Sequence, residues 1–127
     1  MGLIRDLKLE HQKILQLFDE VEKSKFTKEK IIIELKNLAI SHLQKEDQQL
    51  YPSLLNSEKE EIRGIASIFS NIMKKYSKDV ISSINNLLDC NGKVNQDSVD
   101  NFKKISDKIK DRIVIEETIL FPLYGQH

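Results

Sequence analysis

The sequence has one cysteine, two prolines, four glycines and no tryptophan. A single cysteine excludes a disulfide within the chain and fits a reducing compartment. The scarcity of helix breakers, with 31% charged and 39% hydrophobic residues, is typical of a helical domain and excludes a disordered chain. At 127 residues the chain is long enough for one core and too short for two. We therefore expect a single domain over residues 1–127.

Charge and hydropathy exclude two classes of partner. Basic and acidic residues are equal in number, at 20 each, so no net charge draws the chain to nucleic acid or to an anionic membrane. No apolar run approaches the ~18 residues of a membrane span, and no signal-peptide pattern opens the sequence. No glycine-rich phosphate loop, cysteine zinc motif or Ser/His/Asp set is present. We expect a cytoplasmic protein, and none of the enzyme classes that carry these motifs is indicated.

Apolar residues recur at helical spacing in four stretches, which predicts helices over residues 3–24, 28–54, 58–88 and 98–123. Short connections favour antiparallel neighbours. The predicted fold class is therefore all-α, a single up-down-up-down four-helix bundle.

Local signals mark the predicted helix ends. Thr27 is the expected N-cap of the second helix, and residues 57–60 have the S-x-x-E form of a capping box before the third. Pro52 is expected to kink or end the second helix. The turn-forming residues 89–97 are expected to form a loop before the fourth helix, which begins near Ser98.

One pattern occurs twice in the chain. Residues 42–52 read HLQKEDQQLYP, and residues 112–122 read RIVIEETILFP. The two segments share an acidic pair and end in Leu, an aromatic residue and Pro, but the first position is histidine in one and arginine in the other. Two helices built to one pattern predict a pseudo-symmetric bundle with a polar cluster where the matched positions meet.

Helical spacing turns five polar residues toward the core: His11, His42, Glu46, Arg112 and Glu116. A buried charge is costly unless it is paired, so these groups have to be neighbours. In one arrangement, two imidazoles and one or two carboxylates hold Fe(II), Mn(II) or Zn(II), and a 2-His-1-carboxylate set is typical of non-haem iron. In the other, no metal is bound, Arg112 forks between the two glutamates, and the histidines complete a hydrogen-bonded network.

The remaining core positions are apolar. The expected core face of the fourth helix includes Ile119 and Leu123 besides its two polar residues. On the third helix the face includes Ile72 or Met73, and Tyr76 is its one polar-tipped member. No histidine or carboxylate interrupts that third stripe.

These motifs resemble the hemerythrin-like (HHE cation-binding) domains. The resemblance lies in the pattern H-x-x-x-E-[DE]-x-x-L-[YF]-P at residues 42–52, its echo at 112–122 and the upstream pair Glu10–His11. It covers nearly the whole chain. It implies a four-helix bundle with a non-haem di-iron centre, histidines from all four helices, and bridging carboxylates from the second and fourth. It also implies binding or sensing of oxygen or nitric oxide, sensing of redox state, or storage of iron.

The ligand set that the resemblance implies is incomplete in this chain. His11 and His42 match the histidines of one iron, and Glu46 and Glu116 (or its neighbour Glu117) match the bridging carboxylates. The other iron lacks its ligands, because the third helix has no histidine and the matching position on the fourth is arginine. We expect one bound metal ion, with iron favoured over another divalent metal and a mononuclear site favoured over a di-iron site.

Three residues are expected beside this ligand set. Arg112 would stand in the place of the missing iron, Glu117 lies one residue off the core face, and Tyr76 reaches toward the centre from the third helix. The expected partners are a metal ion and a diatomic gas, and no protein partner is indicated.

The alternative hypothesis is a metal-free bundle that acts as a protein-interaction or regulatory module, with Arg112 neutralising the core carboxylates. Converged histidines with room for an ion would favour metal binding. A closed, salt-bridged centre with an exposed apolar patch elsewhere would favour the module.

Overall fold

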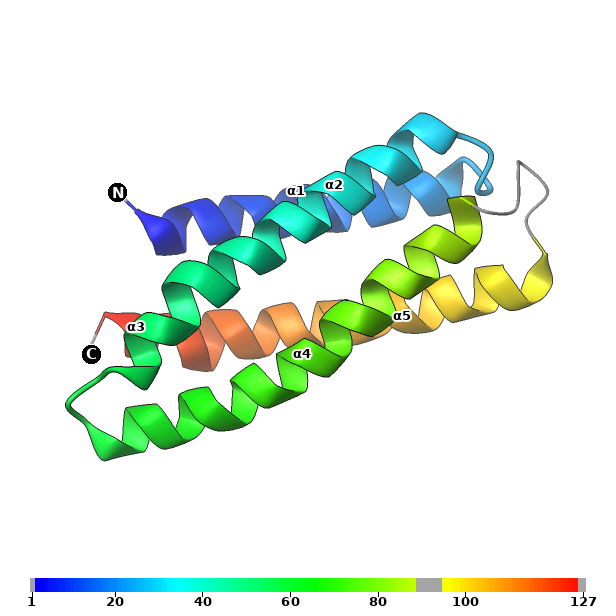
Figure 1. Ribbon diagram of the computed structural model, residues 1–127. Coiled ribbons are helices and arrows are strands. Elements are labelled where there is room, and N and C mark those ends of the chain that lie inside the picture. Colours follow the sequence, from blue (N-terminus) through cyan, green and yellow to red (C-terminus); the bar gives the residue numbers. More distant parts are fainter. Residues whose placement is uncertain (1, 89–94, 126–127) are drawn as a thin grey trace.

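The computed structural model describes residues 2–88 and 95–125, which form four antiparallel helical rods (Figure 1). The first rod is α1 (Leu3–Lys23). The second consists of α2 (Glu29–Lys45), the π-helical turn η1 (Glu46–Leu50) and α3 (Tyr51–Leu55). The third is α4 (Glu60–Leu88). The fourth consists of α5 (Gln96–Ile115), the π-helical turn η2 (Glu116–Leu120) and α6 (Phe121–Tyr124). No strand occurs in this part of the chain, and the predicted all-α four-helix bundle is confirmed.

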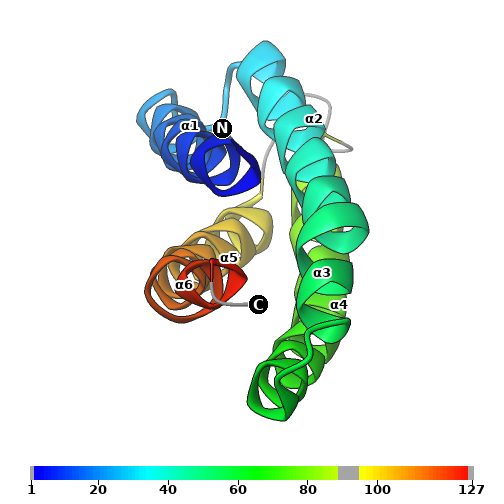
Figure 2. The ribbon, with the colours of Figure 1, turned by 90° about the vertical axis from the view of Figure 1, so that its left-hand side faces the viewer.

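The rods pack in sequence order around one core. α1 lies on α2, α2 on α4 and α4 on α5, and a smaller contact between α5 and α1 closes the bundle (Figure 2). None of the helices within residues 2–88 and 95–125 is long and apolar enough to cross a membrane.

Two apolar clusters divide the core along its length. One fills the half nearest the α1–α2 connection; its largest members are Leu17, Phe18, Leu35, Ile84 and Phe102. The other fills the half that contains α3 and α6; its most buried members are Leu7, Leu50, Leu54, Ala66 and Leu120. The expected inward-facing polar residues lie between the two clusters, so apolar layers cover them from both ends.

The expected cap at Thr27 is wrong. α2 begins at Glu29, and its N-cap is Lys28, which makes no side-chain cap bond. The Thr27 hydroxyl instead donates to the carbonyl of Ser24 at 2.6 Å. It therefore closes the turn after α1 and does not satisfy a free N–H of α2.

Two further helix starts differ from the expected ones. The hydroxyl oxygen of Ser57 accepts from the N–H of Lys59 at 3.2 Å, only two residues on, so a full capping box is not formed before α4. The fourth rod begins at Gln96, ahead of Ser98, because the Asn95 side chain accepts from the Ser98 N–H at 2.8 Å and caps the helix. Residues 89–94 of the expected loop lie outside the described residues.

Pro52 neither ends the second rod nor interrupts it, since α3 continues to Leu55. Both Pro52 and Pro122 lie two residues after a π turn. Proline has no N–H to donate and crowds the carbonyl four residues back. A π turn contains one extra residue, which accommodates this defect without stopping the helix.

The π turns also change which residues face the core. Ile119, which helical spacing places on the core face, is 42% exposed, and Leu120 is fully buried instead. Each residue of a π turn rotates the chain by a smaller angle about the helix axis than a residue of an α-helix does. Leu120, four positions after Glu116, therefore points inward, and Ile119, three positions after it, points outward. On α4, Met73 rather than Ile72 is the buried residue.

The connection between α1 and α2 contains two residues in the left-handed conformation, Lys25 (φ 57°) and Phe26 (φ 62°). The Phe26 N–H donates to the Val21 carbonyl at 3.1 Å, and its ring is buried. Lys25 is exposed. Its backbone conformation therefore costs free energy that no side-chain contact of Lys25 offsets.

We expect Lys25→Gly to raise the free energy of unfolding by about 0.5 kcal/mol, since relief of left-handed strain exceeds the added freedom of the unfolded glycine. Urea denaturation measures the change. The control is Lys104→Gly, at an exposed position inside α5, which should lower stability by about 0.7–1 kcal/mol. Equal losses in both variants would contradict the strain at Lys25.

Candidate metal centre

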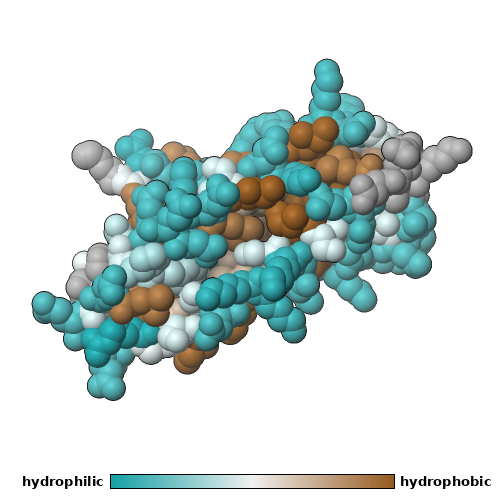
Figure 3. Space-filling model, in the orientation of Figure 1, coloured by the Kyte–Doolittle hydropathy of each residue, from teal (hydrophilic) through white to brown (hydrophobic). Residues whose placement is uncertain are grey.

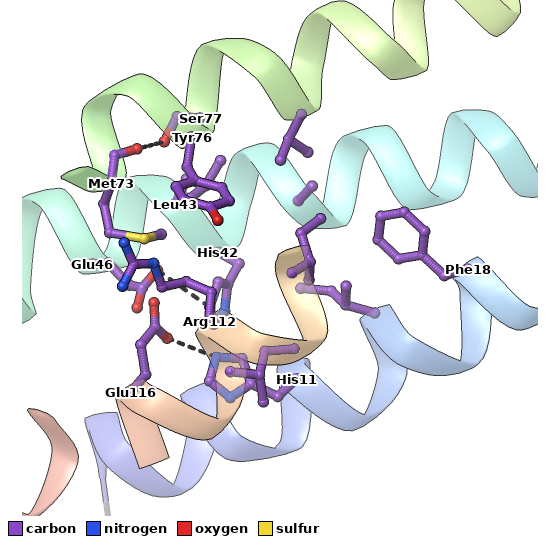
Figure 4. A pocket seen from close by; sticks show the side chains of 15 residues that line it. His11, Phe18, His42, Leu43, Glu46, Met73, Tyr76, Ser77, Arg112 and Glu116 are labelled. Atoms are coloured by element: carbon purple, nitrogen blue, oxygen red, sulfur yellow. Dashed lines mark hydrogen bonds and ion pairs between the residues drawn. The ribbon is translucent and has the colours of Figure 1, made fainter. Parts of the chain in front are cut away.

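Four potential ligand side chains converge at the middle of the bundle (Figure 4). His11 comes from α1, His42 from α2, and Glu46 and Glu116 are the first residues of the two π turns. One ligand atom of each lies within 4.8 Å of the others. Ligands opposite one another across an octahedral ion with bonds of about 2.1 Å are about 4.2 Å apart. The four atoms therefore fit around one ion after a small inward movement.

The sequence places these four residues by simple helical geometry. His11 lies on the face of α1 that also buries Leu7 and Ile14. His42 and Glu46 are four residues apart and so occupy the same face of the second rod. Glu46 and Glu116 each begin a π turn, a distortion that often occurs at functional sites. All four residues are at most 4% exposed.

His11 contacts a carboxylate at each ring nitrogen. Its Nε2 lies 2.9 Å from Oε2 of Glu116, and its Nδ1 lies 2.7 Å from Oε2 of Glu117. Burial acts to lower the pKa of His11, but the two carboxylates outweigh burial and raise it above its usual value. Phe121 stacks on the ring at 5.4 Å between centroids and fixes its plane. Both ring nitrogens of His11 therefore lie at hydrogen-bond distance from a carboxylate oxygen.

The pKa of His42 shifts in the opposite direction to that of His11. The Nδ1 of His42 lies 2.8 Å from Oε1 of Glu10, and its Nε2 lies 3.4 Å from Oε1 of Glu46. Burial and the charge of neighbouring His11 lower the pKa of His42. The neutral ring that donates from Nδ1 to Glu10 therefore fits the site, and it leaves the lone pair of Nε2 directed into the cluster.

The two histidines share one arrangement. Each presents Nε2 to the cluster and has Nδ1 held by an outer carboxylate, Glu117 for His11 and Glu10 for His42. Metal-binding histidines usually carry such an outer carboxylate, which fixes the ring and makes the inner nitrogen more basic. Glu117 thus contacts His11 from beside the four-residue group. Sequence reasoning did not assign a role to Glu10, which also pairs with Lys45.

Glu46 carries the least satisfied carboxylate of the cluster. Both of its oxygens are buried without a hydrogen-bond partner. Burial and the nearby carboxylate of Glu116 raise the pKa of Glu46 well above its usual value. Buried polar atoms nearly always have a hydrogen-bond partner or a bound ion. A divalent cation would supply the missing partner of two adjacent carboxylates. The donor set therefore fits a metal ion.

Arg112 does not form the expected fork between Glu46 and Glu116. The residue is 8% exposed, and no carboxylate of the described chain lies within 4 Å of its guanidinium. Its guanidinium carbon lies 4.9 Å from the ring centre of Tyr76 and 5.4 Å from that of Phe69. The long side chain extends to the aromatic rings of α4, where cation–π attraction holds it.

A cavity of about 50 Å³ adjoins the four converging side chains and Arg112. A single water molecule needs about 10–15 Å³ of such space, so the cavity has room for a few molecules of that size. Most of the remaining wall is apolar and includes Ile14, Phe18, Leu43, Met73, Val80 and Ile113. Figure 4 draws the side chains that line the cavity, and the surface that they present to it is almost wholly apolar.

Comparison with known proteins gave one match. A family model described as the hemerythrin HHE cation-binding domain matches residues 2–124. No curated protein and no solved structure matches the chain.

We expect Glu46→Gln to raise the free energy of unfolding of chelator-treated protein at pH 7 by about 1 kcal/mol, because a neutral amide costs less to bury than an unpaired carboxylate. Denaturant titration in excess chelator measures this. The control, Glu58→Gln, changes an exposed carboxylate and should shift stability by less than about 0.5 kcal/mol. A loss of stability in Glu46→Gln would mean that the Glu46 carboxylate has a partner in the metal-free protein.

Proposed function

The chain belongs to the hemerythrin HHE cation-binding domain family, and from this premise we propose that it binds one divalent metal ion through His11, His42, Glu46 and Glu116. The observation that carries the proposal is the convergence of four buried ligand atoms within 4.8 Å. The outer carboxylates that hold both histidines support it, because a purely structural pair of histidines does not need this arrangement.

We propose that the metal is iron and that the site is mononuclear. Two imidazoles with carboxylates and open positions suit non-haem Fe(II). A second ion would need further ligands on the α4 side of the cluster. In residues 2–88 and 95–125 only the one group of four potential ligands is found. On the α4 side, the Arg112 guanidinium lies against Tyr76 and Phe69, so a cation already occupies this side of the bundle.

The proposed role is binding or sensing of oxygen or nitric oxide. An iron ion with an open position supplies the site for a diatomic gas. The chain supplies the rest: buried histidines hold the ion, and the apolar wall of the adjoining cavity admits a small uncharged molecule and disfavours bulk water. We propose no enzymatic activity. A cytoplasmic location, proposed from the single cysteine, belongs to the same hypothesis.

The alternative, a metal-free interaction module, predicts a centre closed by salt bridges. Two features count against it. Arg112 makes no ion pair with the cluster, and both oxygens of Glu46 lack a hydrogen-bond partner, although Oε1 lies 3.4 Å from Nε2 of His42. A centre kept only for structure would be expected to satisfy these charges.

We expect anaerobically reconstituted protein to hold close to one Fe(II) per chain by elemental analysis, and His42→Ala to lose it. Bound metal should also raise the melting temperature, and a chelator should reverse the rise. Two irons per chain would contradict the mononuclear site. No iron, together with no change in melting temperature on adding Fe(II), would favour the interaction module.

We expect Glu10→Gln to weaken metal binding about 10- to 100-fold without changing the stoichiometry, because the amide orients His42 but no longer makes its inner nitrogen more basic. Competition with a chromophoric chelator measures the affinity. Glu58→Gln, an exposed site distant in sequence from the cluster, is the control and should bind as the unmodified chain does. Equal affinities in both variants would show that Glu10 acts only through its pair with Lys45.

A further inference from the structure

α4 exposes a stripe of isoleucines on its outer face. Ile68 is 60% exposed and Ile72 is 38% exposed, and Ile65 is half-buried beside them. The three residues follow one another at spacings of three and four, so they lie along one side of the helix. In Figure 3, apolar surface interrupts the charged side chains along the lower edge of the molecule, where the first half of α4 runs in Figure 1. A single exposed isoleucine is ordinary, whereas a continuous stripe indicates a contact surface.

Opposite charges stand at the two ends of this isoleucine stripe. Glu61 lies seven residues before Ile68, and Lys75 lies seven residues after it. Seven residues make about two turns of an α-helix, so both charged side chains are in line with Ile68. Both are exposed, and neither belongs to an ion pair within residues 2–88 and 95–125. The stripe is therefore complementary in charge to a reversed copy of itself.

Gly64 lies next to the stripe, in the interior of α4 and exposed. A glycine inside a helix costs about 0.5–1 kcal/mol relative to alanine. Packing within the chain does not require this glycine, because a Cβ added at Gly64 would meet nothing within 4 Å. A missing side chain on an outer face lets another molecule approach the helix backbone closely.

We propose that two copies of this chain associate through the outer face of α4, with the two helices antiparallel and the two Ile68 side chains at the two-fold axis. Reversal of the helix places Glu61 of each copy opposite Lys75 of the second copy. It also places Ile65 opposite Ile72 of the second copy, on either side of the axis. A two-fold interface needs a patch that is complementary to itself, and this stripe meets that requirement.

Charge excludes the parallel arrangement of the same two helices. Parallel pairing would place Glu61 against Glu61 and Lys75 against Lys75, and like charges across an interface are unfavourable. The proposed association does not depend on the proposed metal binding, because α4 contributes none of the four potential ligands. A contact between single helix faces is a small interface, so we expect a dissociation constant on the order of 10–100 μM.

The first test is sedimentation velocity of the full chain in excess chelator, from low micromolar to nearly millimolar concentration. We expect the unmodified chain to shift from monomer to dimer over this range. Ile68→Glu places two carboxylates against each other at the axis and should raise the dissociation constant at least about a hundredfold. The control is Leu9→Glu, which puts the same charge at a 54% exposed apolar position on α1 and should leave dimer formation unchanged.

The second test exchanges the charges at the ends of the stripe. Glu61→Lys alone, or Lys75→Glu alone, brings like charges together at both ends and should raise the dissociation constant about tenfold. The double variant Glu61→Lys/Lys75→Glu has the net charge of the unmodified chain and restores both opposite-charge pairs. We expect its dissociation constant to return to that of the unmodified chain. These exposed substitutions keep the test decisive if Ile68→Glu fails to fold, which its circular dichroism and melting temperature would reveal.

Three results would overturn the proposal. One is an unmodified chain that stays monomeric over the whole concentration range. Another is a dimer that Ile68→Glu, correctly folded, forms as readily as the unmodified chain does, since the contact would then lie elsewhere. The third is a double charge variant that remains as weak as the single variants, because antiparallel pairing requires recovery.

Discussion

The contact on which this fold depends most is His11 between Glu116 and Glu117. It joins α1 to the fourth rod through two short contacts at a largely buried position, where those rods otherwise touch little. Ionisable groups at this depth are stable only with opposite charges beside them. The same requirement positions the rest of the centre: His42 turns to Glu10, Arg112 reaches the rings of α4, and apolar clusters close both ends.

The π turns link the fold to the site. Each begins at a cluster glutamate, lies two residues before a proline, and shifts the inward face by one residue. The same local defect therefore positions Leu120 in the core and allows the rod to continue past Pro122. Because both copies of the sequence pattern carry it, the pseudo-symmetry extends to the backbone as well as to the ligands.

Periodicity and the repeat predict the fold and bring His11, His42, Glu46 and Glu116 together, because both follow from which face of a helix is buried. They misplace Ile119, since regular spacing assumes an α-helix and a π turn is not visible in hydropathy. The repeat itself contains the correct answer, as it pairs Leu120 with a leucine at position 50. The role of Glu10 and the direction of Arg112 depend on neighbouring rods, which spacing within one helix does not describe.

The matched positions His42 and Arg112 show how one substitution divides a symmetric centre. A histidine binds a metal with a lone pair, whereas an arginine brings its own positive charge and only donors. The histidine position can therefore hold a metal ion, whereas the arginine position supplies its own positive charge. Glu46 and Glu116 complete the ligand group with the two histidines, and the Arg112 guanidinium lies against the Tyr76 ring. By this reasoning, the substitution favours the proposed single metal ion over two.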